Sequence, residues 1–346
     1  MRTAVFHQSF RDDERLLDSR TQRAWMAAFL AALFTMPFWG SDYLLAMACI
    51  VGIHLVATLG LNVTTGSAGL ISLAHAAFMG VGCYTVAWLA RHGWPFWLTL
   101  PTAGALAALL GVVVGLPSLR VKGLYLAIAT LAGHFVLSFV FREWDSVTGG
   151  VPGTTIPRAS LFGFELRGDR RNFFLIFGCV VLLALAARNL ARTHHGRAFV
   201  AVRDRDFSAE ILGVNLLRTK LAAFAVGAFY AGVAGGLLGY FYGSITPEYF
   251  ALTLAVFYLA AIIVGGLGSV LGSVLGAVFM TFVPEALRLL AHAGSQWLPG
   301  LAGLLLPMGQ VVFGLLIIGF LIFEPHGLAA VWARVRRTFH LWPFKT

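Results

Sequence analysis

Residues Tyr43–Leu61 read YLLAMACIVGIHLVATLGL, a run without a single charged side chain. An α-helix rises about 1.5 Å per residue, so roughly 20 apolar residues are needed to cross the hydrocarbon core of a lipid bilayer, which is about 30 Å thick. A stretch of this length and composition therefore predicts a membrane-spanning helix. Similar stretches recur along the rest of the chain.

The overall composition supports the same interpretation. Of the 346 residues, 59% are hydrophobic, 12% are charged and 39 are glycine. The single hydrophobic core of a water-soluble protein could not bury so much apolar surface, whereas lipid can solvate it. The net charge of +10 comes mainly from arginines between the apolar stretches, without a recognised nucleic-acid module. We therefore expect contact with a lipid bilayer and no binding of nucleic acid.

Ten stretches suit a membrane span by length and hydropathy. The predicted fold class is an all-α polytopic membrane protein with about ten transmembrane helices. The third stretch is rich in Gly, Ser and His, so we expect it to form either a broken helix or a re-entrant segment. The ten stretches are Ala24–Trp39, Tyr43–Leu61, Leu70–Ala90, Phe96–Leu116, Gly123–Phe141, Asn172–Ala187, Leu221–Phe241, Phe250–Leu267, Gly272–Ala291 and Gly303–Phe323.

The basic residues predict the orientation. With ten spans and a cytoplasmic N-terminus, 18 basic residues lie in cytoplasmic segments and six on the outer side. Both termini are then cytoplasmic. This predicts a cytoplasmic tail over 1–23, a transmembrane domain over 24–328 and a basic cytoplasmic tail over 329–346, with an external loop at 142–171 and a long cytoplasmic segment at 188–220.

The sequence lacks several motifs of enzyme chemistry. It has no G-x-x-x-x-G-K-[ST] phosphate loop and no H-E-x-x-H motif, and its three cysteines are far apart. We therefore expect no ATPase activity, no catalytic residue, no metal and no cofactor in this chain. Two alternatives stay open. A membrane-embedded enzyme would need clustered His, Asp or Cys. An ion-coupled carrier would need buried acidic residues, which are scarce here, or a substitute such as His54, His75 or His134.

Two glycine-rich regions are unusual at membrane depth. Residues 62–82 contain Gly66, Gly69 and Gly80 together with several hydroxyl side chains. Irregular backbone at this depth must be buried or line a wet cavity, so this region either packs helices closely or lines a transport path. The second region contains Gly265, Gly266 and Gly268. Because Gly268, Gly272 and Gly276 recur at every fourth residue, they predict a tight crossing on one helical face.

The cytoplasmic segment 188–220 predicts a short amphipathic helix. Its apolar residues can share one side while charged residues lie elsewhere, and Gly213 ends or bends the helix. Such a helix either docks into a groove on a partner protein or lies on the membrane surface. The apolar residues are Phe199, Val202, Phe207, Ile211 and Leu212.

Several motifs in order over roughly residues 43–328 resemble the permeases of branched-chain amino acid ATP-binding-cassette importers, the LivM type. Related urea and amide permeases share these motifs. Ala74 departs from the pattern, because the family often has glycine there. The matching segments are GLISLAHAAFMG at 69–80, LRVKGLYLAI at 119–128, WDSVTGG at 144–150, residues 196–221 and VGGLGS at 264–269.

The resemblance implies an assembly and a mechanism. The partners would be a second homologous permease, two cytoplasmic ATP-binding subunits that bind the ATP, and a periplasmic or lipid-anchored substrate-binding protein. The location would be the bacterial inner membrane, the fold of the two-times-five-helix kind and the cargo Leu, Ile or Val, with urea, amides or other amino acids as alternatives. The residues that would contact the ATPase are Arg203, Asp204, Arg205, Asp206, Ser208, Glu210 and Gly213.

An alternating-access mechanism also needs polar groups along a path. Ser72, His75, Tyr125 and Thr130 supply hydrogen-bonding groups within apolar stretches. A zwitterionic amino acid needs such groups, or a helix N-terminus for its carboxylate. We therefore expect these four side chains to lie along the path.

Overall fold

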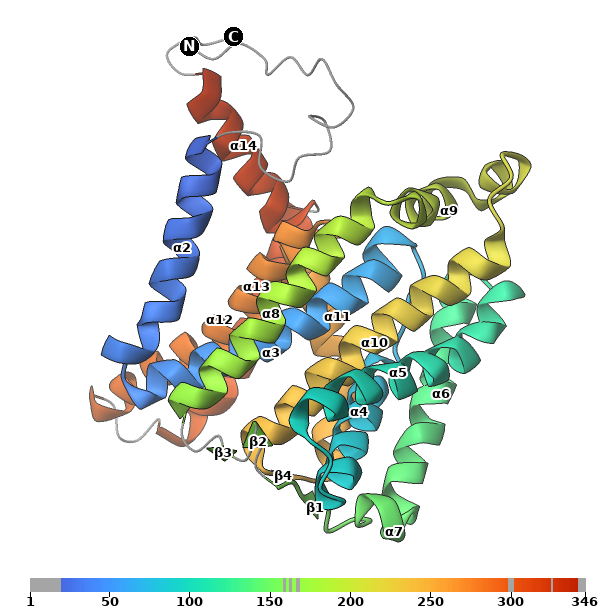
Figure 1. Cartoon of the computed structure of the whole chain (residues 1–346). Coiled ribbons are helices and arrows are strands. Elements are labelled where there is room, and N and C mark those ends of the chain that lie inside the picture. The colour runs from blue at the N-terminus through green and yellow to red at the C-terminus, as the bar shows by residue number, and fades with distance from the viewer. Residues whose placement is uncertain are drawn as a thin grey trace.

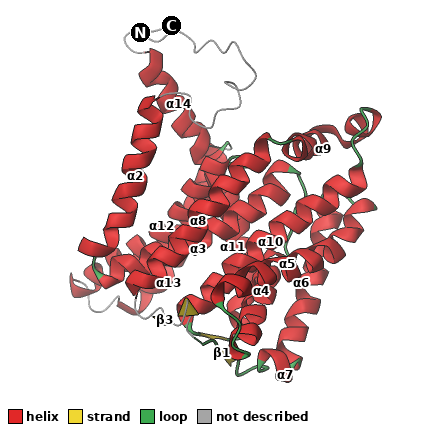
Figure 2. Cartoon of the chain, in the orientation of Figure 1, coloured by secondary structure: helices red, strands yellow, loops and turns green. Residues whose placement is uncertain are grey.

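The computed structural model describes residues 20–157, 160–161, 164–165, 169–297, 302–324 and 326–341. Residues 1–19 and 342–346 of the predicted tails, and parts of the predicted external loop, lie outside these ranges. Helices make up most of the described chain, and the strands form two short pairs (Figure 2). Seven of the described helices are long and apolar enough to cross a bilayer. The predicted all-α membrane class is thus confirmed, while the count of ten spans stays a prediction.

Each of the ten apolar stretches overlaps one helix over most of its length (Figure 1). These helices are α2 (Arg20–Trp39), α3 (Asp42–Leu61), α4 (His75–Arg91), α5 (Phe96–Gly115), α6 (Leu124–Glu143), α8 (Asp169–Arg192), α10 (Leu216–Tyr242), α11 (Leu252–Gly265), α12 (Val270–Trp297) and α13 (Ala302–Phe323).

Shorter elements connect these helices. The two antiparallel pairs are Thr154–Thr155 (β1) with Ser244–Ile245 (β4), and Ser160–Leu161 (β2) with Phe164–Glu165 (β3). The connecting elements are the π-helix η1 (Asn62–Ser67), the 3-10 helices η2 (Leu116–Leu119) and η3 (Pro247–Phe250), the helices α7 (Asp145–Thr148), α9 (His194–Ile211) and α14 (Gly327–Leu341), and the strands β1 (Thr154–Thr155), β2 (Ser160–Leu161), β3 (Phe164–Glu165) and β4 (Ser244–Ile245).

Helix α10 is the central element, because it packs against α3, α4 and α5. Small residues let the backbones approach closely, as is common between membrane helices. A Cβ atom added to Gly82 of α4 would lie 2.0 Å from the Gly232 carbonyl oxygen of α10. One added to Gly80 would lie 2.5 Å from the Phe141 ring of α6. Gly80 therefore packs closely against Phe141, in agreement with the packing role predicted for it.

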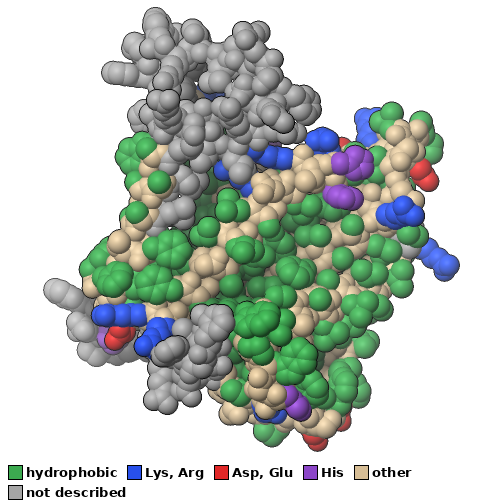
Figure 3. Space-filling view, viewed as in Figure 1, with side chains coloured by type: hydrophobic (Ala, Val, Ile, Leu, Met, Phe, Trp, Pro, Cys, Tyr) green, Lys and Arg blue, Asp and Glu red, His purple; other side chains and the backbone are tan. Residues whose placement is uncertain are grey.

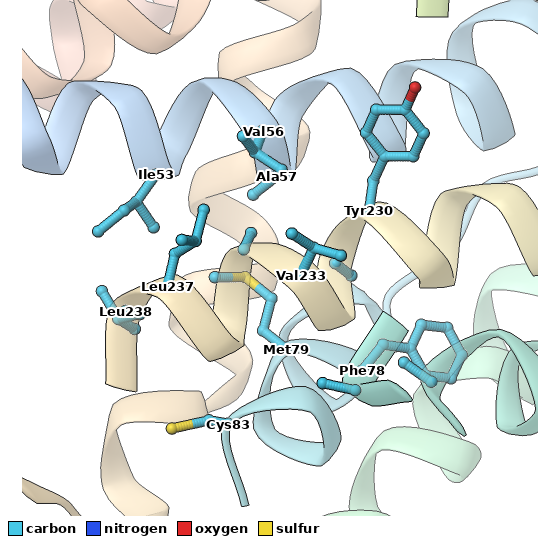
Figure 4. Close-up of a cluster of buried hydrophobic side chains, with 14 of the residues drawn as sticks. Ile53, Val56, Ala57, Phe78, Met79, Cys83, Tyr230, Val233, Leu237 and Leu238 are labelled. Atoms are coloured by element: carbon cyan, nitrogen blue, oxygen red, sulfur yellow. The ribbon is translucent and has the colours of Figure 1, made fainter. Parts of the chain in front are cut away.

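Apolar side chains from α3, α4 and α10 fill the space between these helices. Figure 4 shows Ile53 of α3, Met79 of α4 and Leu237 of α10 in the space between the three helices. All are almost completely buried, and such packing contributes most of the stabilisation once lipid covers the outside. The cluster includes Ile53, Val56, Ala57, Phe78, Met79, Cys83, Val233, Leu237 and Leu238.

The outside of the bundle is also apolar. Hydrophobic side chains cover the middle of the face in Figure 3, and charged side chains gather toward its two ends. On the outer sides of α5 and α6, large side chains such as Leu109, Phe135, Val136 and Phe139 are exposed. This distribution suits a protein surrounded by lipid at mid-height and by water at both ends.

The third apolar stretch, Leu70–Ala90, is irregular only over its first residues, and from His75 onward it is the continuous helix α4. Helix α3 continues into η1, residues 68–74 are irregular, and α4 begins only at His75. Two hydroxyls in η1 bond to backbone carbonyls: Thr64 to Ala223 at 3.1 Å and Thr65 to Leu70 at 3.1 Å. Such side chain–backbone bonds offer an alternative to regular helical bonding, which explains the irregular path.

The prediction that Gly268, Gly272 and Gly276 share one helical face is wrong. Gly268 precedes α12 in a loop and has a positive φ of 76°, which favours glycine. Gly272 and Gly276 do lie in α12 and pack against α11, where a Cβ added to Gly276 would lie 2.0 Å from the Ala261 carbonyl oxygen. The four-residue spacing could not reveal that the helix begins after Gly268.

Candidate functional site

The broken segment, residues Asn62–Ala74, is tied to the glycine loop, residues Gly265–Ser269. The Asn62 amide Nδ2 donates to the Ser269 carbonyl and to Ser273 Oγ, each at 2.7 Å. Its Oδ1 accepts a hydrogen bond from the Gly268 N–H at 2.7 Å. Because Asn62 is buried, these bonds satisfy polar groups that have no access to water. Sequence reasoning did not single out Asn62, since its partners lie about 200 residues away.

Arg203 of α9 reaches the same junction. Its Nη1 donates a hydrogen bond to the Gly66 carbonyl oxygen at 2.9 Å. Gly66 has no room for a side chain, because a Cβ would lie 1.9 Å from Asn62 Oδ1 and 2.5 Å from the Gly268 nitrogen. A Cβ on Gly69 would lie 2.7 Å from Arg203 Cγ. The predicted glycines at 66, 69 and 268 therefore meet the predicted coupling residue Arg203 in one place.

The glycine loop also contacts the start of α14. A Cβ added to Gly266 would lie 3.0 Å from Ala329 Cβ, and one added to Gly327 would lie 2.6 Å from the Gly266 nitrogen. A Cβ added to Gly265 would lie 2.0 Å from the Gly272 carbonyl oxygen. The loop thus lies between α9, α12 and α14, and small residues permit each approach.

Three of the four predicted path residues are buried beside the break. Thr130 Oγ1 of α6 accepts a hydrogen bond from the Leu73 N–H at 3.0 Å. His75 Nε2 lies 2.9 Å from the Ala57 carbonyl oxygen of α3. The Ser72 hydroxyl is buried and has no hydrogen-bond partner among the described residues. Buried hydroxyls are normally paired, so the unpartnered Ser72 hydroxyl is an exception beside the break.

Tyr125 does not join these residues. Its side chain is 75% exposed on the first turn of α6, whereas Thr130 of the same helix is buried. The two residues are separated by about 140° around the helix, so they face different directions. Position within an apolar stretch therefore did not suffice to place Tyr125 beside Ser72.

Helix α9 is divided by a kink. Arg205 has non-helical backbone angles, φ −156° and ψ 94°. Phe199 and Val202 lie before the kink and are buried, while Phe207 and Ile211 lie after it and are each 72% exposed. The expectation that these residues share one apolar side is therefore wrong. A sequence pattern with helical spacing assumes an uninterrupted helix, and the change of direction at Arg205 breaks that assumption.

The distal half of α9, residues Asp206–Ile211, ends in an exposed turn. Leu212 is 83% exposed, and Gly213 follows with a positive φ of 88°. The end of the helix predicted at Gly213 thus agrees with the structure. Asp204, Arg205, Ser208 and Glu210, which the resemblance assigned to ATPase contact, are likewise exposed.

Asp206 links the kink to two other elements. Its carboxylate lies 2.5 Å from Lys122 Nζ, which precedes α6, and 3.7 Å from Lys220 Nζ of α10. The hydrogen bond from the Lys122 ammonium holds the pKa of the Asp206 carboxyl below its usual value. Neither lysine was singled out as a site residue, although Lys122 belongs to the LRVKG motif.

A cavity of about 220 Å³ lies at this junction of the broken segment, α6, α9 and α10. Its polar lining matches a wet space at a helix end rather than an apolar ligand pocket. Among the described residues, no group of three or more His, Cys, Asp or Glu side chains could hold a metal ion. The lining includes Gly69, Lys122, Leu126, Arg203, Asp206 and Lys220.

Apolar helices around a buried irregular segment, joined to a kinked helix at one end, define an all-α polytopic membrane protein. Residues 43–321 match the family described as "Branched-chain amino acid transport system / permease component". The chain belongs to this family of permease components.

Individual relatives agree with the family match. Over 292 residues the chain is 34% identical to the high-affinity branched-chain amino acid transport system permease protein LivM of Escherichia coli (strain K12), which covers 77% of this chain and 69% of that protein. It is 27% identical over 290 residues to a probable branched-chain amino acid transport permease protein LivH of Methanocaldococcus jannaschii, covering 81% and 89%. No solved structure matches the chain.

Proposed function

We propose that this chain is a transmembrane subunit of an ATP-binding-cassette importer that moves branched-chain amino acids across a bacterial inner membrane. Support for the substrate class comes from the LivM and LivH relatives, whose names state branched-chain amino acid transport. The partners are a second homologous permease, two cytoplasmic ATP-binding subunits and a substrate-binding protein. The chain crosses the membrane ten times with both termini inside.

The observation that carries the mechanism is the hydrogen bond from Arg203 to the Gly66 carbonyl oxygen. It connects a helix outside the apolar bundle with the broken segment inside it. A change in the position of α9 alters the position of Arg203, and Arg203 acts on the end of the π-helix η1, which leads into the irregular residues 68–74. Movement at the end of the bundle therefore reaches Ser72 and His75, because both residues directly follow this backbone.

The distal half of α9 supplies the contact with the ATP-binding subunit. Phe207, Ile211 and Leu212 are large, apolar and exposed. An exposed apolar helical turn suits a hydrophobic groove on a partner. Charged neighbours such as Asp204 and Glu210 would surround this contact and contribute to its specificity.

The substrate path runs along the break between α3 and α4. Ser72 offers an unpartnered hydroxyl, and Thr130 and His75 hold the backbone on either side of it. The N-terminus of α4 offers backbone N–H groups to a carboxylate. Tyr125 does not lie beside Ser72, because it is exposed on α6.

Uptake by proteoliposomes that contain the complete assembly tests the proposal. We expect leucine uptake that requires ATP and the binding protein. Ile211→Ser removes an exposed apolar contact after the kink and should lower uptake about tenfold or more. Val200→Ser is the matched control, since Val200 is a partly exposed apolar residue of α9 before the kink, and it should change uptake by less than about twofold.

Three results would count against the proposal. Uptake by this chain without ATP-binding subunits would favour an ion-coupled carrier. Uptake of urea or amides in preference to leucine would keep the importer but replace its substrate. Equal uptake by Ile211→Ser and Val200→Ser would show that the distal half of α9 does not make the contact with the ATP-binding subunit that transport requires.

A further inference from the structure

Helix α14 and the start of α12 enclose a groove that the transport mechanism does not use. From α14, the groove is lined by Ala329, Trp332, Ala333, Arg336 and Arg337. These residues are spaced as i, i+3, i+4, i+7 and i+8, so they form one helical face. From α12 and the preceding loop come Leu271 and Ser269, and the groove has a volume of about 550 Å³.

The two arginines of this face differ from the third arginine of α14. Arg334 pairs with Glu324, with 2.9 Å between Nη2 and Oε1. Arg336 and Arg337 are exposed, and neither has a carboxylate partner within the part of the chain that the structure describes. Within the described ranges, two guanidinium groups therefore line the groove without a carboxylate, as a site for an anion requires.

The rest of the groove is apolar. Trp332 is 55% exposed and Leu271 is 43% exposed. Tryptophan is enriched where a membrane protein meets the headgroup layer, because its ring is apolar and its N–H is polar. An occupant of this groove must therefore present an anionic group to the arginines and a hydrocarbon part to Leu271 and Trp332.

The groove lies at the end of the bundle that carries α9. Gly327, at the start of α14, contacts Gly266, and the same loop contacts Arg203 through Gly268. In the proposed orientation this is the cytoplasmic end. The family match stops at residue 321, so α14 is not among the elements through which the family is recognised.

We propose that this face of α14 binds the headgroup of an anionic phospholipid, with Arg336 and Arg337 on the phosphate and Trp332 and Leu271 along the upper acyl chains. The charge of the two arginines, the apolar lining and the place at the membrane boundary all match this ligand. This proposal requires that the chain lies in a membrane. It does not depend on which substrate the chain transports.

Lipid retention by the purified assembly, measured by native mass spectrometry, tests this site. Phosphatidylglycerol and phosphatidylcholine are added in equal amounts, and inorganic phosphate serves as a third probe. We expect the assembly to prefer phosphatidylglycerol. The double substitution Arg336→Gln/Arg337→Gln should weaken that binding about thirtyfold, because each basic residue near an anionic surface contributes a roughly fivefold effect. Inorganic phosphate should not displace the lipid, since it makes no apolar contact.

The matched control is Arg334→Gln/Arg218→Gln, which removes the same charge at exposed positions outside the groove. We expect it to change phosphatidylglycerol binding by less than about threefold. Equal binding by the wild-type protein and Arg336→Gln/Arg337→Gln would overturn the proposal, as would equal retention of the two lipids by the wild-type protein. A photo-crosslinking amino acid in place of Trp332 should label lipid. Labelling of a protein subunit instead would show that the groove is a subunit interface.

Discussion

The Arg203 guanidinium donates a hydrogen bond to the Gly66 carbonyl oxygen across 2.9 Å, although the two residues are 137 positions apart. Gly66 belongs to the π-helix η1, whose first residue, Asn62, binds the glycine loop. One side chain of α9 thus contacts the point where two irregular backbone segments meet. Irregular backbone is easier to displace than a regular helix, so this contact can transmit movement.

Arg203→Gln should separate ATP hydrolysis from transport. Glutamine is too short to reach Gly66, and the loss of a charged hydrogen bond costs about 1.5–3 kcal/mol, or roughly tenfold or more in an equilibrium. We expect leucine uptake to fall about tenfold while ATP hydrolysis changes less than about twofold. Both rates are measured on the same proteoliposomes.

Arg197→Gln is the control for Arg203→Gln. Arg197 also donates to a backbone carbonyl, that of Arg192 at 2.9 Å, but this bond stays at the junction of α8 and α9. The Arg197→Gln variant should therefore leave the ratio of leucine uptake to ATP hydrolysis unchanged. If both variants lost coupling between ATP hydrolysis and uptake to the same extent, the loss would not be specific to the bond between Arg203 and Gly66. That result would contradict the role proposed for Gly66.

Asn62→Ala should destabilise the protein markedly. It leaves the Gly268 N–H without its acceptor and removes the bonds that the Asn62 amide donates to the Ser269 carbonyl and Ser273 Oγ. Each buried polar group left unsatisfied costs about 1–3 kcal/mol. Asn215→Ala is the comparison, because Asn215 only caps the exposed start of α10, and loss of a cap costs about 1 kcal/mol. The drop in the midpoint of thermal unfolding in detergent should be at least about twice as large for Asn62→Ala. Equal drops would contradict the structural role of Asn62.

The ion pair between Asp206 and Lys122 is expected to be sensitive to acid. The pKa of the Asp206 carboxyl is held below the usual value by the hydrogen bond from Lys122. A carboxyl with a lowered pKa in the folded state stabilises the protein above its unfolded pKa, about 4, and this contribution is lost as the pH falls through the lower folded pKa. Asp206→Asn should therefore reduce stability at neutral pH by about 1 kcal/mol or more, because the exposed Lys122 pair contributes little but the buried Lys220 ammonium loses a carboxylate neighbour.

The difference between wild type and Asp206→Asn should shrink on acidification below pH 4 or so. Unfolding midpoints measured from neutral to acidic pH provide the comparison. Asp204→Asn is the control, since Asp204 is exposed and pairs only with its neighbour Arg203 among the ion pairs of the described residues. A difference that grows on acidification would contradict the assignment of the lowered pKa to Asp206.

The helices could be predicted from the sequence because lipid imposes a simple rule. A run such as Tyr43–Leu61 has one way to satisfy its backbone in hydrocarbon, and α3 covers Asp42–Leu61. The break before His75 was foreseeable for the complementary reason, since glycine and hydroxyl residues weaken regular helical bonding.

The geometry of the site depended on contacts that no local pattern contains. The three partners of Asn62 lie beyond residue 260, and the kink at Arg205 separates Phe207 from Val202 within an otherwise regular spacing. The predicted set of path residues mixed buried Thr130 with exposed Tyr125, because hydropathy indicates membrane depth but not which side of a helix faces the protein. Motif resemblance located Arg203 without indicating that it contacts Gly66.

Gly82→Ala should disrupt the packing of α4 against α10. The added Cβ would lie 2.0 Å from the Gly232 carbonyl oxygen, and backbone atoms cannot move aside cheaply. Overpacking of this kind costs about 1–3 kcal/mol or more. Gly178→Ala in α8 is the matched control, because nothing lies within 4 Å of its Cβ position, and alanine favours a helix by up to about 1 kcal/mol. Thermal unfolding in detergent should move in opposite directions for the two variants.

Thr130 allows a structural role to be distinguished from a place on the path. Thr130→Val keeps the shape but removes the hydroxyl that accepts the Leu73 N–H, which costs about 1–3 kcal/mol because the group is buried. Thr130→Ser keeps the hydroxyl and loses one methyl group, at about 1 kcal/mol. If the hydroxyl positions Ser72 for the substrate, Thr130→Val should raise the KM for leucine uptake roughly tenfold while Thr130→Ser stays within about threefold of wild type. Equal KM values for both variants, with a lower unfolding midpoint for Thr130→Val, would limit Thr130 to holding α6 against the broken segment.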